Sequence, residues 1–287
     1  MTDHTLLSTS PTRVVTRPNS FLFTMFGDLA YEAAQAKGEP PAVWIGGLIR
    51  LMAAFNISPA AVRQSVSRMT RQGWLEAERH GTRAYYHVTQ RGADRIASLS
   101  PRIYGPVIEW DGRWRLLAYG VPERQRERRD RLRKDLAVLG WASLAASVWI
   151  SPSNSLSAAR AAAESNLLGE EVALFEGHYR GPRSDRELVE HCWNLPAIAS
   201  AYDEFNRVYR PRVESERAEH QLSDEEAFVE RLWLVHDYRK FTYIDPGLPS
   251  TLLPAGWPGT FAAATFREYH RALHRKAARF FAKATQA

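Results

Sequence analysis

The sequence contains a single cysteine, Cys192, among its 287 residues. One cysteine excludes an intramolecular disulfide and any zinc site built from several thiolates, and it is consistent with a reducing cytoplasm. No apolar run approaches the roughly 18 residues that would cross a membrane, and no charged start followed by a hydrophobic core and a cleavage site marks a signal peptide. We therefore expect a cytoplasmic protein that is neither exported nor membrane-spanning.

The sequence also lacks the short motifs that start most familiar catalytic mechanisms. It has no GxSxG, no HExxH, no phosphate-binding P-loop and no Rossmann glycine fingerprint. His270 and His274 lie one helical turn apart, which permits two metal ligands on one helix face. However, His270 falls within an apolar stripe, and no neighbouring cysteine or acid completes a set, so packed or solvated histidines are preferred. We expect no catalytic residues, no bound metal and no cofactor.

Acidic residues are fewer than basic ones, with 32 Asp and Glu against 38 Lys and Arg. The formal net charge of +6 and the pI near 9.5 favour a polyanionic partner such as DNA, RNA, an anionic membrane or a phosphorylated ligand, without choosing among them. Because the chain is long and 45% of its residues are hydrophobic, it can form two or three domains with real cores.

The most specific pattern lies between Ser58 and Thr89. Ser58 suits the N-cap of a helix, and Pro59 suits its first position, where no backbone donor is missed. An apolar stripe with helical spacing follows, formed by Val62, Val66 and Met69. The opposite side is polar and basic: we expect Arg63, Gln64 and Ser67 nearest to DNA bases, and Arg68 and Arg71 at phosphates.

A basic hairpin is expected after this helix, with its turn at about His80 to Thr82. Its polar residues would reach phosphates or the minor groove, namely Arg79, His80, Thr82 and Arg83. An apolar helix from Ser20 and a second helix from Val43 to Phe55 precede the basic helix. These elements predict a winged helix-turn-helix DNA-binding domain at 20–100, after a flexible arm at 1–19. The alternative to DNA binding is a winged helix that binds another protein and whose charged face is simply solvated.

Proline and glycine residues predict a linker at 101–110, and a new domain is expected to begin near Asp111. Strands are expected at 114–119, 141–144, 148–150 and 171–179, with helices at 123–139 and 156–168. This βαββαβ order is typical of a ferredoxin-like unit, here at 111–182. The arginines between Pro122 and Lys134 alternate with acids at ion-pair spacing, which favours a solvated helix face. The remainder, 183–287, is almost wholly helical, so the fold class is α+β and multidomain.

Four segments, in this order, resemble the PaaX-like repressors of phenylacetic acid catabolism. They are SFLFTMFGDLA, AVRQSVSRMTRQGWL with YYHVTQRG, WRLLAYGVPERQRERRDRLRKDLAVLGW, and LVHDYRKF with DPGLPSTLLPAGWPG. The resemblance covers roughly Ser20 to the C-terminus. It implies a homodimeric transcriptional repressor with a winged helix, a central ferredoxin-like domain similar to the small nuclease subunit of CRISPR adaptation, and a C-terminal helical domain. We expect this last domain, 183–287, to serve in effector binding and dimerisation. It also implies that an aryl-CoA thioester such as phenylacetyl-CoA releases the protein from double-stranded operator DNA.

An acyl-CoA effector needs cations or backbone donors for its phosphates and an apolar slot for its acyl group. LVHDYRKF and the proline-rich segment after it carry the most unusual chemistry of the C-terminal half. We therefore nominate as effector-binding residues Trp233, His236, Arg239 and Trp257. For each aromatic among them, packing in a hydrophobic core is the alternative.

A metal-dependent nuclease is the competing function, because the central domain resembles a nuclease subunit. That architecture would place a carboxylate near the end of the first strand, which here reads Tyr119-Gly120-Val121-Pro122. With no acid at this position, we expect the central domain to be a dimerisation scaffold and the protein to be a regulator, not an enzyme.

Overall fold

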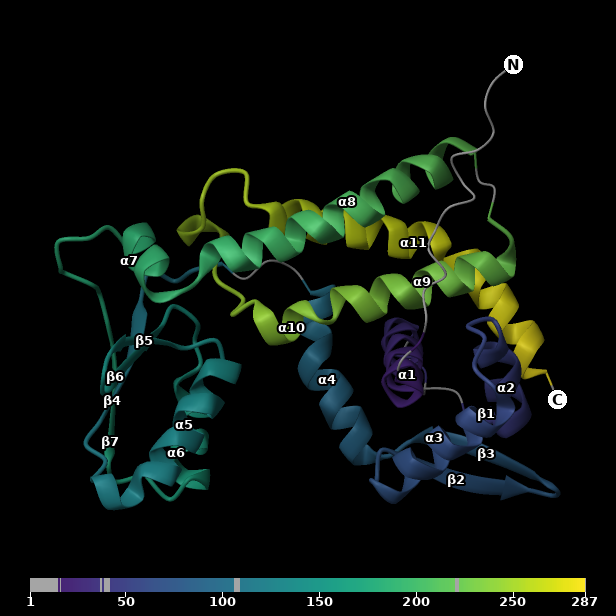
Figure 1. Cartoon of the computed structure of the whole chain (residues 1–287), viewed down its shortest axis with the longest axis horizontal. Coiled ribbons are helices and arrows are strands. Elements are labelled where there is room, and N and C mark those ends of the chain that lie inside the picture. The colour runs from purple at the N-terminus through teal and green to yellow at the C-terminus, as the bar shows by residue number, and fades with distance from the viewer. Residues whose placement is uncertain are drawn as a thin grey trace. The chain divides into compact units, whose positions relative to one another are not determined.

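The computed structural model describes residues 15, 17–36, 38, 42–105, 109–219 and 222–286. The predicted flexible arm, 1–19, lies almost entirely outside these residues. The chain divides into two compact units (Figure 1). The first combines Met1–Ser100, Ser215–His236 and Tyr269–Ala287, and the second combines Pro101–Glu214 and Asp237–Glu268. Each unit is described on its own below.

The first unit begins with the elements of the predicted DNA-binding segment. They are α1 (Pro18–Gln35), β1 (Val43–Trp44), α2 (Ile45–Ala53), α3 (Pro59–Arg71), β2 (Leu75–His80), β3 (Arg83–Val88) and most of α4 (Gln90–Tyr104). The strands form an antiparallel sheet in the order β1-β3-β2. The prediction that a helix begins at Val43 is wrong, because Val43 and Trp44 pair with β3 and the helix begins at Ile45. A β-branched and an aromatic residue both suit such an edge position.

Helix α4 is longer than expected and corrects the predicted linker at 101–110. The helix runs through Pro101 to Tyr104, so the linker cannot begin before Gly105. Proline inside a helix removes one backbone hydrogen bond, but it does not end this helix. Ile96 and Leu99 of α4 are buried, and this packing of the apolar face outweighs the local signal.

The core of the first unit joins residues that are far apart in the sequence. Many of its buried members come from α1, α2, α3 and β2. Others come from two later helices, α9 (Asp224–Tyr238) and α11 (Pro258–Thr285). These two helices contribute Phe228, Leu232, Ala277 and Ala284. In addition, the indole of Trp44 donates to the Thr285 carbonyl at 3.2 Å. The segment 20–100 therefore does not complete its own core.

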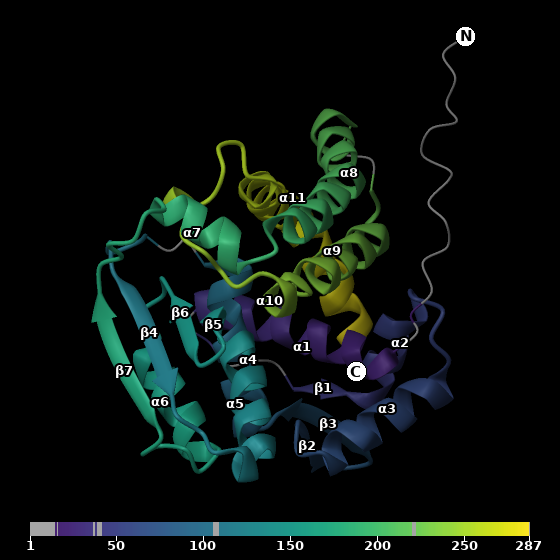
Figure 2. The ribbon, with the colours of Figure 1, turned by 60° about the vertical axis from the view of Figure 1, so that its left-hand side comes forward.

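The second unit contains the predicted βαββαβ order. Its elements are β4 (Trp114–Tyr119), η1 (Glu123–Gln125), α5 (Arg126–Val138), β5 (Ala142–Ala145), β6 (Val148–Ser151), α6 (Leu156–Ser165) and β7 (Val172–Gly177). All neighbours in the sheet, whose order is β5-β6-β4-β7, are antiparallel. Helices α5 and α6 cover the same face of this sheet (Figure 2). Leu117, Leu132 and Leu136 are fully buried between them.

The remaining elements are α7 (Asp185–Cys192), α8 (Leu195–Glu219), α10 (Phe241–Ile244) and η2 (Ser250–Leu252). Helix α8 continues through Pro211. The residues predicted as one helical domain, 183–287, contribute to both compact units, since α8, α9 and α11 each have residues in both. Helices together with two antiparallel sheets confirm the α+β class.

Among the described residues, no helix combines the length and the apolarity that a membrane-spanning segment needs.

Candidate nucleic-acid interface

Helix α3 presents a polar side because its apolar side is used for packing. The Ser58 hydroxyl accepts a hydrogen bond from the Ala61 backbone at 3.3 Å, which fixes the start of the helix as predicted. Val62, Val66 and Met69 are at most 2% exposed. The five predicted DNA contacts of this helix are all exposed: Arg63, Gln64, Ser67, Arg68 and Arg71.

The charge on this side of α3 is not neutralised within the part of the chain that the structure describes. The helix has no acidic residue, and no described carboxylate lies within ion-pair distance of Arg63, Arg68 or Arg71. Unpaired exposed arginines on one helix face produce a positive potential that attracts phosphates. The structure thus places the three arginines, Gln64 and Ser67 on one accessible surface.

The hairpin of β2 and β3 turns at the predicted place, about His80 to Thr82, through a two-residue loop. His80 pairs with Arg83, and Gly81 between them has a φ of 61°, a conformation that glycine adopts without strain. All four predicted hairpin contacts are exposed, namely Arg79, His80, Thr82 and Arg83.

The register of the hairpin separates these four residues, a point that the sequence analysis missed. Paired residues of an antiparallel sheet share a face, and successive residues alternate between faces. His80 and Arg83 are a pair and share the outer face, whereas Arg79 pairs with Ala84 on the face that packs on the core. The two arginines therefore leave the hairpin on opposite sides.

The outer face also carries two acidic residues that the prediction left out. Glu76 contacts His87 at 3.2 Å, and Glu78 contacts His80 at 3.4 Å. The alternating pattern of β2 could have revealed them, since Glu76, Glu78 and His80 lie two residues apart. Positive charge on this face is accordingly concentrated at Arg83, near the tip.

Arg83 is held in place by an aromatic ring. Its guanidinium carbon lies 5.2 Å from the centroid of the Trp44 ring, and that of Arg50 lies 5.0 Å from the same ring. Cation–π contacts of this kind orient an arginine without neutralising its charge. Trp44 thus connects β1 to the tip of the hairpin.

A buried polar network lies on α1, α9 and α11 of the first unit. Arg231 Nε donates to Asp28 at 2.7 Å, and its Nη2 donates to Glu32 at 2.5 Å. The Nε2 atom of His270 lies 2.7 Å from the second Asp28 oxygen. Burial raises the pKa of Asp28, but the charges of Arg231 and His270 overcome this and hold that pKa well below its usual range.

This network corrects one step of the sequence analysis, which found no acid near His270. Ligand atoms of Asp28, Glu32 and His270 lie within 4.8 Å of one another, close enough for a metal ion. The acids were missed because they are more than 230 residues away in the sequence. Both carboxylates already bind the guanidinium of Arg231, which occupies the place of a cation, so a metal would have to displace it.

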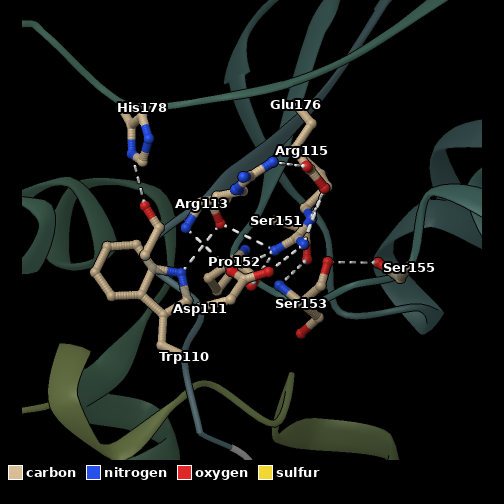
Figure 3. Close-up of polar contacts among 11 residues, drawn as sticks. Trp110, Asp111, Arg113, Arg115, Ser151, Pro152, Ser153, Ser155, Glu176 and His178 are labelled. Atoms are coloured by element: carbon tan, nitrogen blue, oxygen red, sulfur yellow. Dashed lines mark hydrogen bonds and ion pairs between the residues drawn. The ribbon is translucent and has the colours of Figure 1, made fainter.

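In the second unit, two carboxylates near the start of β4 are also bound to arginine (Figure 3). Arg115 is 2% exposed and contacts both Asp111 and Glu176, the latter at 3.0 Å. The hydrogen bond from Arg115 lowers the pKa of Asp111 to about 2. These acids lie at the start of β4, whereas the nuclease alternative requires one at its end.

The nuclease alternative therefore gains no support from the site. The described residues of the second unit contain no group of three His, Cys, Asp or Glu side chains close enough to share a metal ion. The end of β4 reads Tyr119-Gly120, as the sequence indicated.

The four nominated effector residues are divided between the two compact units. Trp233 and His236 belong to the first, where Trp233 packs on Phe21 at a ring distance of 4.6 Å and His236 lies 3.1 Å from the Thr24 hydroxyl. Arg239 and Trp257 belong to the second. Burial lowers the pKa of Arg239. Trp257 lines a cavity of about 410 Å³. Their joint role in effector binding stays a prediction.

Comparison with known proteins places these sites in a family. Residues 17–92 match the model described as "PaaX-like protein", residues 108–189 match "PaaX protein central Cas2-like domain", and residues 193–283 match "PaaX-like protein C-terminal domain". The "Transcriptional repressor PaaX" of Escherichia coli (strain K12) is 30% identical over 246 residues, which cover 84% of this chain and 75% of that protein.

A solved structure shares the fold at lower identity. The "Uncharacterized protein Rv0674 from Mycobacterium tuberculosis" is 20% identical, with a TM-score of 0.58 over 90% of this chain and 99% of that one. The matches follow the chain in the order of the four resembling segments, and they cover the basic helix, the βαββαβ unit and the C-terminal helices. The chain belongs to the PaaX-like family.

Proposed function

We propose that this protein is a DNA-binding transcriptional repressor of an aromatic-acid catabolic operon of the phenylacetate type. The observation that carries the proposal is the exposed basic side of α3, where Arg63, Arg68 and Arg71 have no ion-pair partner among the described residues. The name of the Escherichia coli relative, a transcriptional repressor, supports the same class and argues for a regulator over an enzyme.

The order of elements in the first unit supports a winged helix-turn-helix, in which α3 would be the recognition helix and the β2–β3 hairpin would be the wing. With 13 residues, α3 is about 20 Å long, at about 1.5 Å per residue. A helix of this size enters the major groove, where arginine binds guanine edges and glutamine binds adenine edges. Arg63, Gln64 and Ser67 would then read bases, while Arg68, Arg71 and the hairpin residues would bind backbone.

A homodimer would place two such helices on the half-sites of a roughly palindromic operator. The βαββαβ order and the sheet order β5-β6-β4-β7 support a ferredoxin-like fold for the central segment, which we propose as the dimerisation scaffold. An aryl-CoA thioester would release the DNA by binding more tightly to a conformation whose recognition helices no longer match the half-site spacing.

Footprinting of the DNA upstream of the protein's own gene tests this function. We expect a protected, roughly palindromic site at moderate salt, and loss of protection when phenylacetyl-CoA is added. Absence of any protected site would contradict the repressor proposal. Protection that no aryl-CoA relieves would leave repression in place and contradict the proposed effector.

Replacing Arg63 with alanine is expected to weaken operator binding about 5- to 150-fold, the range for losing a bidentate base contact of about 1–3 kcal/mol. Replacing Arg83 should weaken binding to operator and to unrelated DNA alike, because a phosphate contact carries no sequence information. Gel shifts over a salt series measure both effects. Arg207→Ala, on the exposed surface of α8, is the matched control; wild-type affinity in Arg63→Ala and Arg83→Ala would exclude the assignment.

Trp44 should contribute to DNA binding without touching DNA. Replacing it with alanine removes the ring that holds Arg83, and a cation–π contact of about 0.5–1 kcal/mol predicts an affinity loss of about 2- to 5-fold. Trp44→Phe keeps an aromatic face and should keep most of the affinity. Fluorescence anisotropy with labelled operator compares the two; equal losses would show that the ring does not position Arg83.

A further inference from the structure

The end of α11 packs against the start of the DNA-binding segment, within the first unit. Its last turn lies beside β1 and α2 (Figure 1). Two main-chain carbonyls accept hydrogen bonds there. That of Thr285 accepts from the indole of Trp44 at 3.2 Å, and that of Gln286 accepts from Nη2 of Arg50 at 2.5 Å. Because the last carbonyls of a helix have no partner within the helix, these contacts hold both side chains at the helix end.

Two glycines at the start of α2 make room for this arrangement. A Cβ atom on Gly46 would overlap the ring of Trp44. A Cβ atom on Gly47 would lie 3.1 Å from the indole nitrogen and 3.3 Å from the Cα atom of Thr285. Glycine is less favourable than alanine inside a helix, so two in succession indicate close packing. The indole ring and the end of α11 occupy the space that two side chains would otherwise fill.

The Trp44 ring contacts two arginines that come from different elements. Arg50 lies on α2 and Arg83 lies near the tip of the hairpin, and both guanidinium carbons are about 5 Å from the ring centroid. The two carbons are therefore no more than about 10 Å apart. Phosphates of one DNA strand follow one another about every 3.4 Å along the helix axis. Two cations this close can bind neighbouring phosphates of the same strand.

Neither arginine is neutralised by a carboxylate of the described residues. Both side chains are exposed. Arg50 donates one of its five N–H groups to an uncharged carbonyl, which leaves its charge and its other donors available. The acids on the outer face of the hairpin, Glu76 and Glu78, contact histidines. The sequence analysis left out Arg50 because it precedes the basic pattern at 58–89.

We propose that Arg50 and Arg83 form one phosphate-binding site on the Trp44 ring, with Trp44 as the residue that positions both. The ligand is the backbone of duplex DNA, which the site contacts without regard to sequence. The choice of ligand rests on the proposed function, to which the site adds a contact outside the recognition helix. Arginines stacked on a ring keep their charge and lose less freedom on binding, which suits a phosphate contact.

A free phosphorylated molecule is the competing ligand, because its phosphates would attract the same two cations. Small-molecule sites bury most of their ligand, whereas Arg50 and Arg83 are exposed, which favours the DNA backbone. The two ligands also differ in competition, since inorganic phosphate at constant ionic strength would displace only an anion that binds as a single group.

The phosphate contact is tested by fluorescence anisotropy of the full-length protein with labelled operator and with an unrelated duplex, each over a salt series. Arg50→Gln should reduce the slope of log K against log salt concentration by about 1 with both duplexes. The ratio of its Kd to the wild-type Kd should accordingly shrink about 3- to 4-fold between 50 and 200 mM salt. Arg50→Lys keeps the charge and should keep the wild-type slope.

The control is Arg275→Gln, on the exposed surface of α11, which should keep both affinity and slope. A wild-type slope in Arg50→Gln would overturn the site, and loss of operator binding by Arg63→Ala in the same assay would leave the proposed function in place. Failure of the wild type to bind either duplex would overturn both. Loss of the difference between wild type and Arg50→Gln when inorganic phosphate is added at constant ionic strength would assign the site to a free anion and overturn the proposal.

Gly46→Ala tests the positioning role of Trp44. The added Cβ displaces the ring, but alanine is the better helix former, so the midpoint of thermal unfolding should be unchanged or higher. We expect both duplexes to bind about 2- to 5-fold more weakly, as for Trp44→Ala. Gly27→Ala on α1, whose added Cβ would have its nearest contact at 3.9 Å, is the matched control and should bind normally. Wild-type affinity in Gly46→Ala, or a loss of affinity that only accompanies a loss of stability, would contradict the positioning role.

Discussion

Replacing Arg231 with methionine is expected to lower the free energy of unfolding by about 3–5 kcal/mol, the usual cost of removing one partner from a buried ion pair. The side chains of Arg231 and Asp28 are only 6% and 10% exposed, so water cannot replace the lost guanidinium. Methionine retains much of the arginine volume and leaves Asp28 and Glu32 without their cation. Urea denaturation at pH 7 measures the change, and operator binding should decline because α1 packs against α3 in the same core.

The control is Arg207→Met, which breaks an ion pair with Glu204 on the solvent-exposed surface of α8 and should have little or no effect on stability. Adding Asp28→Asn to Arg231→Met removes one of the two stranded carboxylates and should recover part of the loss. A loss in Arg231→Met no larger than in Arg207→Met would show that the network is not a buried ion pair.

The same network predicts a dependence on pH. The pKa of Asp28 is lower in the folded state than its ordinary value of 3.8, so its contribution is complete above that value and is lost as the pH falls further. The stability difference between wild type and Asp28→Asn should therefore be largest near neutral pH and shrink below about pH 4. A difference that grows on acidification would have the wrong sign for this account.

Replacing Gly140 with alanine is the second large effect, with an expected loss of about 2–4 kcal/mol in the second unit. Gly140 has a φ of 84°, which is unfavourable for any residue with a Cβ atom. An added Cβ would also lie 2.5 Å from the backbone oxygen of Pro246, which cannot move as a flexible side chain does.

A substitution at Gly112 separates the cost of backbone strain from the cost of the contact with Pro246. It has a φ of 77°, but an added Cβ would meet nothing within 4 Å. Gly112→Ala should therefore show the backbone strain alone, about 1–2 kcal/mol. Chemical denaturation followed by tryptophan fluorescence compares both variants; equal losses would mean that the contact with Pro246 is relieved at no cost.

Local signals predicted the basic helix and the βαββαβ order well. Ser58, Pro59 and the Val62–Val66–Met69 stripe determine α3 within the chain itself, and the predicted and observed bounds of β4 agree. The exposed contacts of α3 followed directly, since a buried stripe leaves the opposite side to solvent. The same signals failed at Pro101 and Pro211, where tertiary packing maintains a helix through a proline.

Long-range pairings could not be predicted in this way. Nothing near Asp28 in the sequence indicates Arg231 or His270, which bind its carboxylate in the folded first unit. The face of each hairpin residue could have been predicted from the sequence. Successive residues of β2 alternate between the two faces of the sheet, so Arg79 and His80 lie on opposite faces, as the register shows. Single-sequence reasoning thus placed the predicted DNA contacts of α3 on one exposed side of the helix, but it could not find the partners that distant parts of the chain supply.

The shared core of the first unit has a consequence for biosynthesis. Domains usually fold one after another during synthesis, beginning at the N-terminus. Here the segment that carries α3 is translated early, but its apolar surface is covered by Phe228 and Leu232 of α9 and by Ala277 and Ala284 of α11. That segment must therefore wait on the ribosome with exposed hydrophobic residues until α11 has emerged. A nascent chain or fragment that ends before α9 should bind chaperones and should not yet bind DNA.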